Sequence, residues 1–383
     1  MRIIQIIGGL GTGGADRVML NLGARLKQLG HEVIFATAPH FLWCEELRQQ
    51  GYENWHINNF RGLDVGELRR FIRQTRADDF VIIHDSCSRH FVLKARIFGL
   101  RSQVCLVRHC LPALHSFGAS LLHRCLIEHQ VTVSDAVRDG VVRSGYPRSR
   151  TTRIYPGIET LQFLPAASEA TETLRRRFLG DFPAGGLVIG LVARFHAKAD
   201  RKFPPPGKKG HGLLFQALRR VQIPCRVLLL GPNCQDDRDM LLRLARHYGA
   251  DPAALVFAGF VKDIAPFYSL MDINVLPSRG EGLGLALVEG MAAGVCSVGA
   301  AVGGMKEVIT DGQTGLLFNS GDAASLADCL DRLASDPRLR VRLGRAGQQS
   351  VLERFNSARM AAEFDGLLRR SMRVRPGIMT MWV

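Results

Sequence analysis

The chain has 383 residues, of which 46% are hydrophobic and 22% charged, and this is the composition of a folded protein with room for two domains. No apolar run is long enough to predict a membrane span, and nine scattered cysteines without a Cys-x-x-Cys pair predict neither a disulfide framework nor a zinc site. The net charge of +15 is spread over both halves, without the zinc-finger spacing or aromatic-interleaved basic motif that would indicate nucleic-acid binding.

Short apolar runs alternate with helical segments along the whole chain. This alternation predicts an α/β protein whose parallel sheets are flanked by helices. In the first half, strands are expected at residues 3–7, 33–37, 80–84, 104–107 and 131–134. In the second half, they are expected at residues 187–192, 226–230, 256–259, 273–276 and 295–298.

A glycine-rich loop separates the first strand from the first helix. Gly9-Leu10-Gly11-Thr12-Gly13-Gly14 has the G-x-G-x-x-G spacing of dinucleotide-binding domains. Glycine at positions 13 and 14 lets the backbone approach a ligand closely, whereas a tight turn without a ligand is the alternative. An NAD-binding domain would carry an acid at the end of its second strand. Here that strand ends Ala36-Thr37-Ala38-Pro39-His40, which counts against NAD and weakly allows NADP.

Two helices of the first half have distinct faces. The apolar face of the first consists of Val18, Leu22, Leu26 and Leu29, and Gly30 is its expected end. The other places Arg69, Arg73 and Arg76 opposite Leu68, Phe71 and Ile72. A helix of this second kind fits either contact with an anionic membrane or a solvated basic face over a core-packed helix.

The expected domains meet at a linker formed by residues 155–159 and the polar stretch 166–172. The N-terminal domain is expected to span residues 1–165 and the C-terminal domain residues 166–355. Residues 356–383 are expected to form a last helix and a frayed tail. The scattered cysteines favour a reducing, cytoplasmic setting.

Two glutamates eight residues apart are the most informative feature. Glu281 and Glu289 lie in the segment 277–290, which reads PSRGEGLGLALVEG. The expected geometry is a strand ending near Leu276, a loop that carries Glu281, and a helix beginning around Leu283. Backbone N–H groups at such a helix start suit a phosphate, and Glu289 would lie about 9 Å further along the axis. Carboxylates on both sides of a phosphate suit a nucleotide sugar.

This segment resembles the signature of glycosyltransferase family 4, a Glu followed by seven residues and a second Glu. The resemblance implies a GT-B fold, with two Rossmann-like domains facing a central cleft and a C-terminal helix that crosses back to the first domain. It implies a retaining, hexosyl-type transfer from a UDP- or GDP-sugar to a hydroxyl acceptor. It also implies that Glu281 contacts the donor sugar and Glu289 the ribose. The donor-binding residues between them would be Gly282, Leu283, Gly284 and Leu285.

Other positions extend the resemblance. Gly13-Gly14-Ala15-Asp16 is similar to the family's Gly-Gly-Ala-Glu loop, and Arg194 matches the arginine of the family's phosphate clamp. An insertion displaces the clamp's lysine, so the role is assigned to Lys209, with Lys198 and Lys208 as substitutes. His109 resembles a family histidine near the reacting sugar, although a lone histidine is as often structural. Weaker matches are His84-Asp85, Ser134-Asp135, Gly303–Glu307 and Asp311–Leu317.

The resemblance implies that neither a cofactor nor an obligatory metal is needed, because Arg194 and Lys209 would take the place of the metal. The expected partners are a nucleotide-sugar donor and a saccharide or lipid-linked saccharide acceptor from cell-surface polysaccharide biosynthesis. Peripheral contact with the inner membrane face stays open, and no nucleic-acid partner is expected. The alternatives are a nucleotide-sugar epimerase of GT-B fold, an NAD(P)-dependent Rossmann oxidoreductase and a non-catalytic sugar-binding module.

Overall fold

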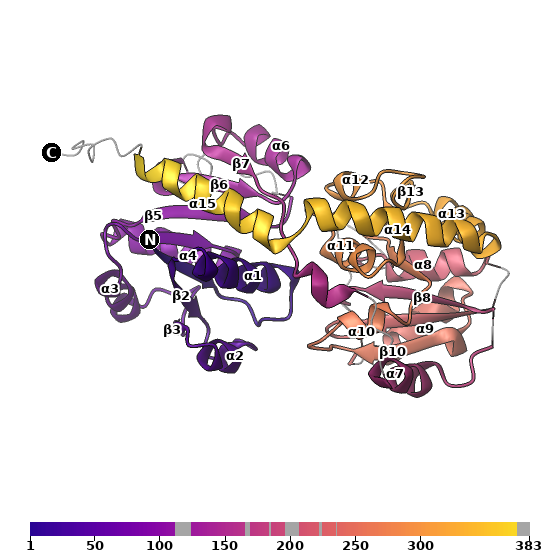
Figure 1. The fold of residues 1–383 in the computed structure, drawn as a ribbon. Helices are drawn as coiled ribbons and strands as arrows, with labels where there is room; N and C mark the ends of the chain where they lie inside the picture. The colour runs from indigo at the N-terminus through magenta and orange to yellow at the C-terminus, as the bar shows by residue number, and fades with distance from the viewer. Residues whose placement is uncertain are drawn as a thin grey trace. The chain divides into compact units, whose positions relative to one another are not determined.

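The computed structural model describes residues 1–111, 124–164, 169–183, 185–195, 207–221, 224–234 and 236–373. The chain forms two compact units (Figure 1). The first combines Met1–Ile158 with the C-terminal residues from Phe355 on, and the second is Glu159–Arg354. The division thus follows Ile158, where the sequence analysis placed it after residue 165. In the described part of the chain, no helix is both long and apolar enough to cross a bilayer.

The first unit is built on a parallel sheet of seven strands in the order β3-β2-β1-β4-β5-β6-β7. Its strands are β1 Arg2–Ile7, β2 Glu32–Thr37, β3 Glu53–His56, β4 Phe80–Ile83, β5 Gln103–Arg108, β6 His129–Thr132 and β7 Thr151–Arg153. The five expected strands are confirmed, with small shifts of their ends. The sequence analysis missed β3 and β7, because these short strands are polar and carry no apolar run.

Helices cover this sheet and bring the end of the chain back to it. They are α1 Gly14–Gln28, α2 Cys44–Gln49, α3 Val65–Gln74, α4 Ser86–Ile97, α6 Asp135–Arg143 and α15 Ser357–Arg373. The C-terminal helix α15 packs against α1, where Arg25 Nε donates to Ser357 Oγ at 2.9 Å and His31 Nε2 lies 2.9 Å from Asp365 Oδ1. Residues 374–383 of the expected tail lie outside the described residues.

The two faces expected on helices of this unit are largely as the sequence indicates. Val18, Leu22 and Leu26 are buried on α1, but Leu29 is 46% exposed because the helix ends at Gln28. On α3, the apolar side is buried and Arg69 and Arg73 are exposed, while Arg76 lies beyond the helix end. The helix is therefore core-packed with a solvated basic face.

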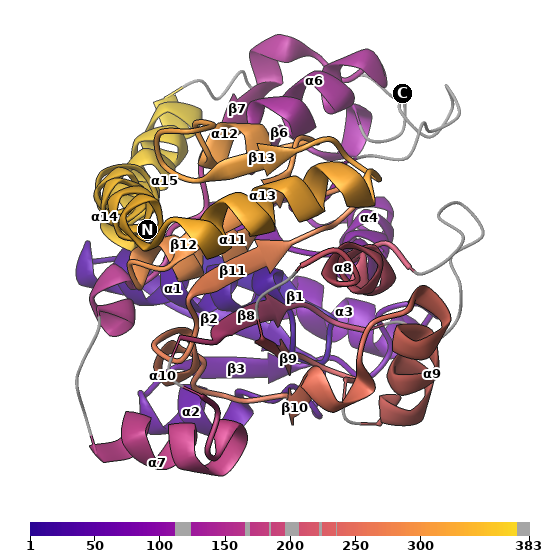
Figure 2. The ribbon, with the colours of Figure 1, turned by 90° about the vertical axis from the view of Figure 1, so that its right-hand side faces the viewer.

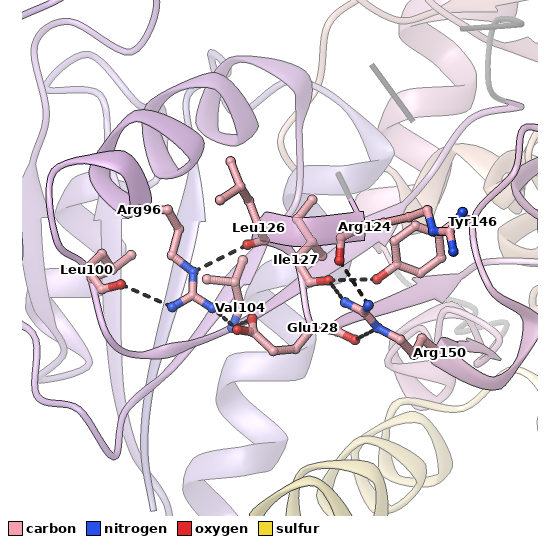
Figure 3. A network of polar contacts seen from close by, with 9 residues as sticks. All are labelled: Arg96, Leu100, Val104, Arg124, Leu126, Ile127, Glu128, Tyr146 and Arg150. Atoms are coloured by element: carbon pink, nitrogen blue, oxygen red, sulfur yellow. Dashed lines mark hydrogen bonds and ion pairs between the residues drawn. The ribbon is translucent and has the colours of Figure 1, made fainter. Parts of the chain in front are cut away.

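Two arginines fix the segment at residues 124–128, which precedes β6 (Figure 3). Arg150 donates to the carbonyl oxygens of Arg124 and Glu128, at 2.9 and 2.7 Å, and to that of Ile127. Arg96 donates to the carbonyl oxygen of Leu126 at 3.3 Å and pairs with the Glu128 carboxylate. Because these donors bind mainly backbone carbonyls, they satisfy polar groups that would otherwise be costly to bury.

The second unit contains a parallel sheet of six strands in the order β10-β9-β8-β11-β12-β13. Its strands are β8 Leu187–Val192, β9 Cys225–Leu230, β10 Leu255–Gly259, β11 Ile273–Leu276, β12 Cys296–Ala300 and β13 Leu316–Phe318. Five were expected, and the three-residue β13 was missed. The helices are α7 Glu169–Leu179, α8 His211–Leu218, α9 Arg238–Tyr248, α10 Ala265–Tyr268, α11 Leu285–Ala292, α12 Met305–Val308, α13 Ala323–Ser335 and α14 Pro337–Arg354. Helices α8 and α9 lie on one side of the sheet and α11 and α14 on the other (Figure 2).

Two expectations for this unit need correction. The helix that carries Glu289 begins at Leu285 rather than near Leu283, because Gly284 caps it in a left-handed conformation with φ +96°. Glu289 therefore lies one helical turn, not two, beyond the start of α11. The stretch at residues 166–172 is not simply a linker, since α7 begins at Glu169.

Candidate functional site

Each sheet has one point where the strand order reverses, and ligands of such sheets bind beyond the carboxyl ends of the strands there. In the second unit this point lies between β8 and β11. Arg194 follows β8, and the loop that carries Glu281 follows β11. In the first unit it lies between β1 and β4, which are followed by the glycine-rich loop and by His84. Within each unit, the candidate residues therefore lie at the carboxyl edge of the sheet, where such ligands bind.

Lys209 and Glu281 form an ion pair in the second unit. Lys209 Nζ lies 2.5 Å from Glu281 Oε1, and both side chains are largely shielded from solvent. The backbone brings them together: the N–H of Arg279 donates to the Lys208 carbonyl oxygen at 3.0 Å. Lys208 reaches over Gly280, and Lys198 lies outside the described residues. Of the two described lysines, Lys208 and Lys209, the structure places Lys209 on the Glu281 carboxylate.

Gly210 permits this close approach of two chain segments. Its φ is +76°, and a Cβ atom there would lie 2.0 Å from the carbonyl oxygen of Pro277. Any side chain would force residues 208–210 away from the Glu281 loop. The absence of a side chain at Gly210 therefore helps to hold Lys209 close to Glu281.

Gly303 and Gly304 pack against the backbone of the loop that carries Glu281. The N–H of Gly304 donates to the carbonyl oxygen of Glu281 at 3.3 Å. A Cβ atom at Gly303 would lie 2.2 Å from that same oxygen, and one at Gly304 would lie 2.1 Å from the carbonyl oxygen of Gly282. The Gly303–Glu307 match of the sequence analysis therefore supports the loop through its backbone. Leu283 and Gly284 are buried, and Leu285 opens α11.

Glu289 is buried in α11 with only 7% of its surface exposed. Its Oε2 atom lies 3.0 Å from the hydroxyl oxygen of Tyr268, which donates the hydrogen bond to the carboxylate. The same hydroxyl lies 3.1 Å from the carbonyl oxygen of Ala286. Tyr268 is fully buried at the end of α10, and no motif in the sequence linked it to Glu289. Only the packing of α10 on α11 could reveal this partner.

Arg194 projects from a backbone segment fixed on both sides. The N–H of Ala193 donates to Leu230 O at 2.9 Å and that of Phe195 to Pro232 O at 3.1 Å. Asn233 then adopts φ +68°, unusual for a residue other than glycine, and its side-chain amide donates to Phe195 O at 3.1 Å. Strained residues of this kind collect at functional sites. The sequence analysis did not single out Asn233, because no motif in the sequence indicates a role for it.

The glycine-rich loop of the first unit is closed by its own acid. Gly13 caps α1, and its N–H donates to Asp16 Oδ2 at 2.7 Å. Asp16 is buried, with 6% exposed. Gly14 begins the helix. The N–H of Gly13 is thus already engaged, and the position where the family resemblance has Glu serves here as part of a capping box.

His109 belongs to a chain of three hydrogen-bonding side chains. His84 Nδ1 lies 3.3 Å from His109 Nε2, and His84 Nε2 lies 2.9 Å from Gln5 Oε1. The amide oxygen of Gln5 only accepts, so His84 carries its proton on Nε2 and accepts at Nδ1 from His109 Nε2. His109 is thereby left with Nδ1 as an acceptor. Desolvation lowers the pKa of His109 to about 4, and desolvation followed by His109 lowers the pKa of His84 well below 6.5.

The weaker candidates are explained by local structure. Asp85 caps α4 by accepting from the N–H of Ser88 at 2.7 Å, and Ser134 caps α6 by accepting from that of Val137 at 3.1 Å. Asp135 pairs with Arg138 at 2.8 Å. Asp311 accepts from the N–H of Leu317 at 2.8 Å and so closes the turn before β13.

No three His, Cys, Asp or Glu side chains come together as metal ligands within the described residues. The expectation that activity needs no metal stays a prediction. Among the described residues, the segments that follow β8 and β11 contain the cations Arg194, Lys208, Lys209 and Arg279.

Two parallel sheets flanked by helices, each with a ligand-binding edge, define the GT-B class. The crystal structure of Alr3699/HepE from Anabaena, in complex with UDP and glucose, matches with a TM-score of 0.83 over 97% of this chain and 100% of that chain, at 19% identity. A likeness at this identity shows the fold. The fold class expected from the sequence is confirmed.

Sequence profiles define the family more narrowly. The profile described as Glycosyltransferase Family 4 matches residues 12–161, and that described as Glycosyl transferases group 1 matches residues 201–336. The chain belongs to this family of glycosyltransferases.

Curated relatives match over part of their length. A D-inositol 3-phosphate glycosyltransferase of Corynebacterium aurimucosum is 29% identical over 66% of this chain and 55% of its own. The lipopolysaccharide core biosynthesis glycosyltransferase LpsE of Rhizobium meliloti is 30% identical over 46% of this chain and 48% of its own. The chain spans about half the length of the curated relatives it matches.

Proposed function

We propose that this protein is a retaining glycosyltransferase that moves a sugar from a UDP- or GDP-sugar to a hydroxyl acceptor. The observation that carries the proposal is the Lys209–Glu281 ion pair, held at the strand-order reversal of the second sheet. Arg194 leaves the neighbouring strand at the same edge, and Glu289 lies one turn into the helix that follows Glu281. A carboxylate for the sugar, cations for the diphosphate and a second carboxylate for the ribose are the groups such a donor needs.

Negative charge builds on the diphosphate as the bond to the sugar breaks, and fixed cations stabilise it. In the proposed reaction Arg194 and Lys209 supply that charge in place of a metal. The sugar is attacked on the face that the diphosphate leaves, and the departing diphosphate removes the proton of the acceptor hydroxyl. No dedicated general base is then required. His109, neutral at pH 7 because its pKa is about 4, would accept a hydrogen bond at Nδ1 from a sugar hydroxyl.

Several relatives support the substrate class. HepE crystallises with UDP and glucose, and LpsE is named for lipopolysaccharide core biosynthesis. We therefore propose a lipid-linked or polysaccharide precursor as the acceptor, with hexosyl transfer at the cytoplasmic side of a membrane. Arg69 and Arg73, exposed on α3, are available for peripheral contact with anionic lipid. Sedimentation with anionic vesicles at low and high salt tests this contact, and no binding at low salt would remove it.

A donor screen tests the reaction. UDP-, GDP-, ADP- and TDP-sugars are compared by thermal shift, because a bound donor stabilises the fold, and the best donor is then tested for transfer with and without EDTA. Glu281→Ala should abolish transfer and leave nucleotide binding nearly intact, whereas Glu289→Ala should weaken nucleotide binding. Equal loss of binding in both variants would contradict the assigned roles. Consumption of the donor without any acceptor would instead identify an epimerase.

A further inference from the structure

The loop that follows β9 runs beside the segment that carries Arg194. Strands β8 and β9 are parallel neighbours, so residues 193–195 and residues 231–234 leave the sheet side by side at its carboxyl edge. Backbone hydrogen bonds continue the pairing beyond the strands, since the N–H of Phe195 donates to the carbonyl oxygen of Pro232 at 3.1 Å. We call residues 231–234 the β9 turn.

The β9 turn holds its third residue in a left-handed conformation. The N–H of Cys234 donates to the carbonyl oxygen of Gly231 at 3.4 Å, which closes a four-residue turn with Pro232 second and Asn233 third. Asn233 has φ +68°, and it is the one residue other than glycine with positive φ among those that the structure describes. Glycine adopts this conformation at the least cost, and asparagine tolerates it. The turn therefore accepts an asparagine but does not itself require the side chain.

Two side chains of the β9 turn bind the carbonyl groups on either side of Arg194. Asn233 Nδ2 donates to the carbonyl oxygen of Phe195 at 3.1 Å. The Cys234 Sγ atom, which is fully buried, lies 3.5 Å from the carbonyl oxygen of Ala193. Desolvation raises the pKa of the Cys234 thiol to about 12, so this thiol keeps its proton and donates. A glycine at position 233 would satisfy the turn and leave the Phe195 carbonyl without its side-chain donor.

We propose that Asn233 is a positioning residue, which holds the backbone at Arg194 so that the guanidinium reaches the diphosphate of the donor. This inference rests on the proposed transfer reaction, in which Arg194 acts on the diphosphate. A backbone fixed on both sides of the arginine lowers the conformational entropy lost when the guanidinium binds an anion. The two parallel N–H groups of a guanidinium bind phosphate only in the correct orientation, and a displacement of about 1 Å costs roughly 100-fold in rate.

The test removes the side chain of Asn233 without disturbing the turn. Asn233→Gly keeps the positive φ and loses only the amide, and because Asn233 is exposed the variant should fold. Asp322→Ala is the matched control in the same unit. The Asp322 carboxylate caps α13 by accepting from the N–H groups of Ala324 and Ser325, at 2.9 and 3.1 Å, so this variant also breaks contacts between a side chain and the backbone.

UDP and uridine are titrated calorimetrically into the full-length chain, with GDP and guanosine in parallel. Asn233→Gly should weaken UDP binding roughly fivefold and uridine binding less than about twofold, because only the diphosphate meets Arg194. Asp322→Ala should leave both affinities within about twofold of the wild type. In an Arg194→Met background, Asn233→Gly should have no further effect, since a residue that acts through another has no role once that residue is gone. Additive losses would overturn the positioning role.

Hydrogen exchange without nucleotide measures the hold on the segment directly. Asn233→Gly should speed exchange at the N–H of Phe195 by roughly fivefold, whereas Asp322→Ala should leave that rate unchanged. An unchanged exchange rate or an unchanged UDP affinity in Asn233→Gly would each overturn the inference. A wild type that binds neither UDP nor GDP would contradict the proposed function, and the exchange rate then decides whether Asn233 holds residues 193–195.

Discussion

The ligand-binding edges of the two sheets are built in opposite ways. In the second unit, Lys209 neutralises Glu281 and Tyr268 binds Glu289, so each carboxylate has a partner close to it. In the first unit, burial lowers the pKa values of His84 and His109, so these two histidines are neutral at pH 7.

This difference indicates which kind of ligand the edge of each sheet can bind. A carboxylate next to a diphosphate would repel it, and the Lys209 ammonium removes that repulsion before the ligand arrives. The neutral histidines of the first unit bring no charge, which suits an uncharged group such as a sugar hydroxyl. Four measurements test this comparison.

The largest effect is expected at Gly210. Gly210→Ala should destabilise the second unit by about 3 kcal/mol or more and abolish transfer, because its Cβ would collide with the Pro277 carbonyl. Gly249→Ala is the control, since φ is +75° there and the nearest atom is the flexible Arg219 side chain. It should cost about 1–2 kcal/mol. Chemical denaturation, monitored by hydrogen exchange, measures the free energy of unfolding of both variants. Equal destabilisation would show that the close approach of Gly210 to Pro277 does not affect stability.

Removal of the lysine charge is expected to have the next largest effect. Lys209→Met should lower the rate of transfer about 100-fold, because the variant loses the cation proposed to act on the diphosphate and removes the ion-pair partner of Glu281. Lys208→Met should lower it less than about threefold, since Lys208 reaches over Gly280 and does not contact the carboxylate. Steady-state kinetics with the identified donor measures the rate of transfer of both variants. A reversed order would assign the clamp to Lys208.

The neutral histidines predict a loss of stability in acid that is confined to the first unit. The pKa of His109 is lowered to about 4 and that of His84 also lies below 6.5, so the unfolded chain binds protons that the folded chain does not. Stability is then fully present above pH 6.5 and falls as the pH drops toward 4, by about 1.4 kcal/mol per pH unit for each histidine.

His84→Gln should reduce this slope by the share of one histidine, because burial also lowers the pKa values of His109 and His129 to about 4 and both remain. His56→Gln, at an exposed site, should leave the slope unchanged. Hydrogen exchange of each unit between pH 7 and pH 4 is the measurement. A slope equally steep in both units would assign the effect to other groups.

The smallest effect is expected at Tyr268. Tyr268→Phe removes one buried hydrogen bond to Glu289 and should destabilise the second unit by about 1 kcal/mol, or somewhat more because the acceptor is a carboxylate. Tyr248→Phe, whose hydroxyl makes no hydrogen bond within the described residues, should change stability by less than about 0.5 kcal/mol. Thermal unfolding of both variants makes the comparison. No difference between them would mean that Glu289 does not depend on Tyr268.

Much of the fold could be predicted because apolar runs mark buried parallel strands. Ten strands were expected and found, while β3, β7 and β13 were missed because short polar or peripheral strands lack that run. The start of α11 was misplaced by two residues, because Gly284 adopts a left-handed conformation with φ +96° and caps the helix. A glycine can also continue a helix, so the sequence alone does not say which of the two conformations it adopts.

The candidate site residues also divide into those that the sequence predicted and those that only the packing of the chain revealed. Glu281, Glu289 and the glycines and apolar residues around them lie in one short segment, so the segment as a whole predicted a nucleotide-sugar site. Which lysine reaches Glu281 could not be read from spacing, because an insertion precedes Lys209 and the close packing of Gly210 on Pro277 decides it.

The two α/β halves and the paired glutamates could be predicted because apolar periodicity and a contiguous motif are local properties of the chain. The Gln5–His84–His109 chain and the Tyr268–Glu289 hydrogen bond form only when separate strands and helices pack together. Their members lie on different strands and helices, and parallel strands bring their carboxyl ends to one edge regardless of how far apart they are in the chain.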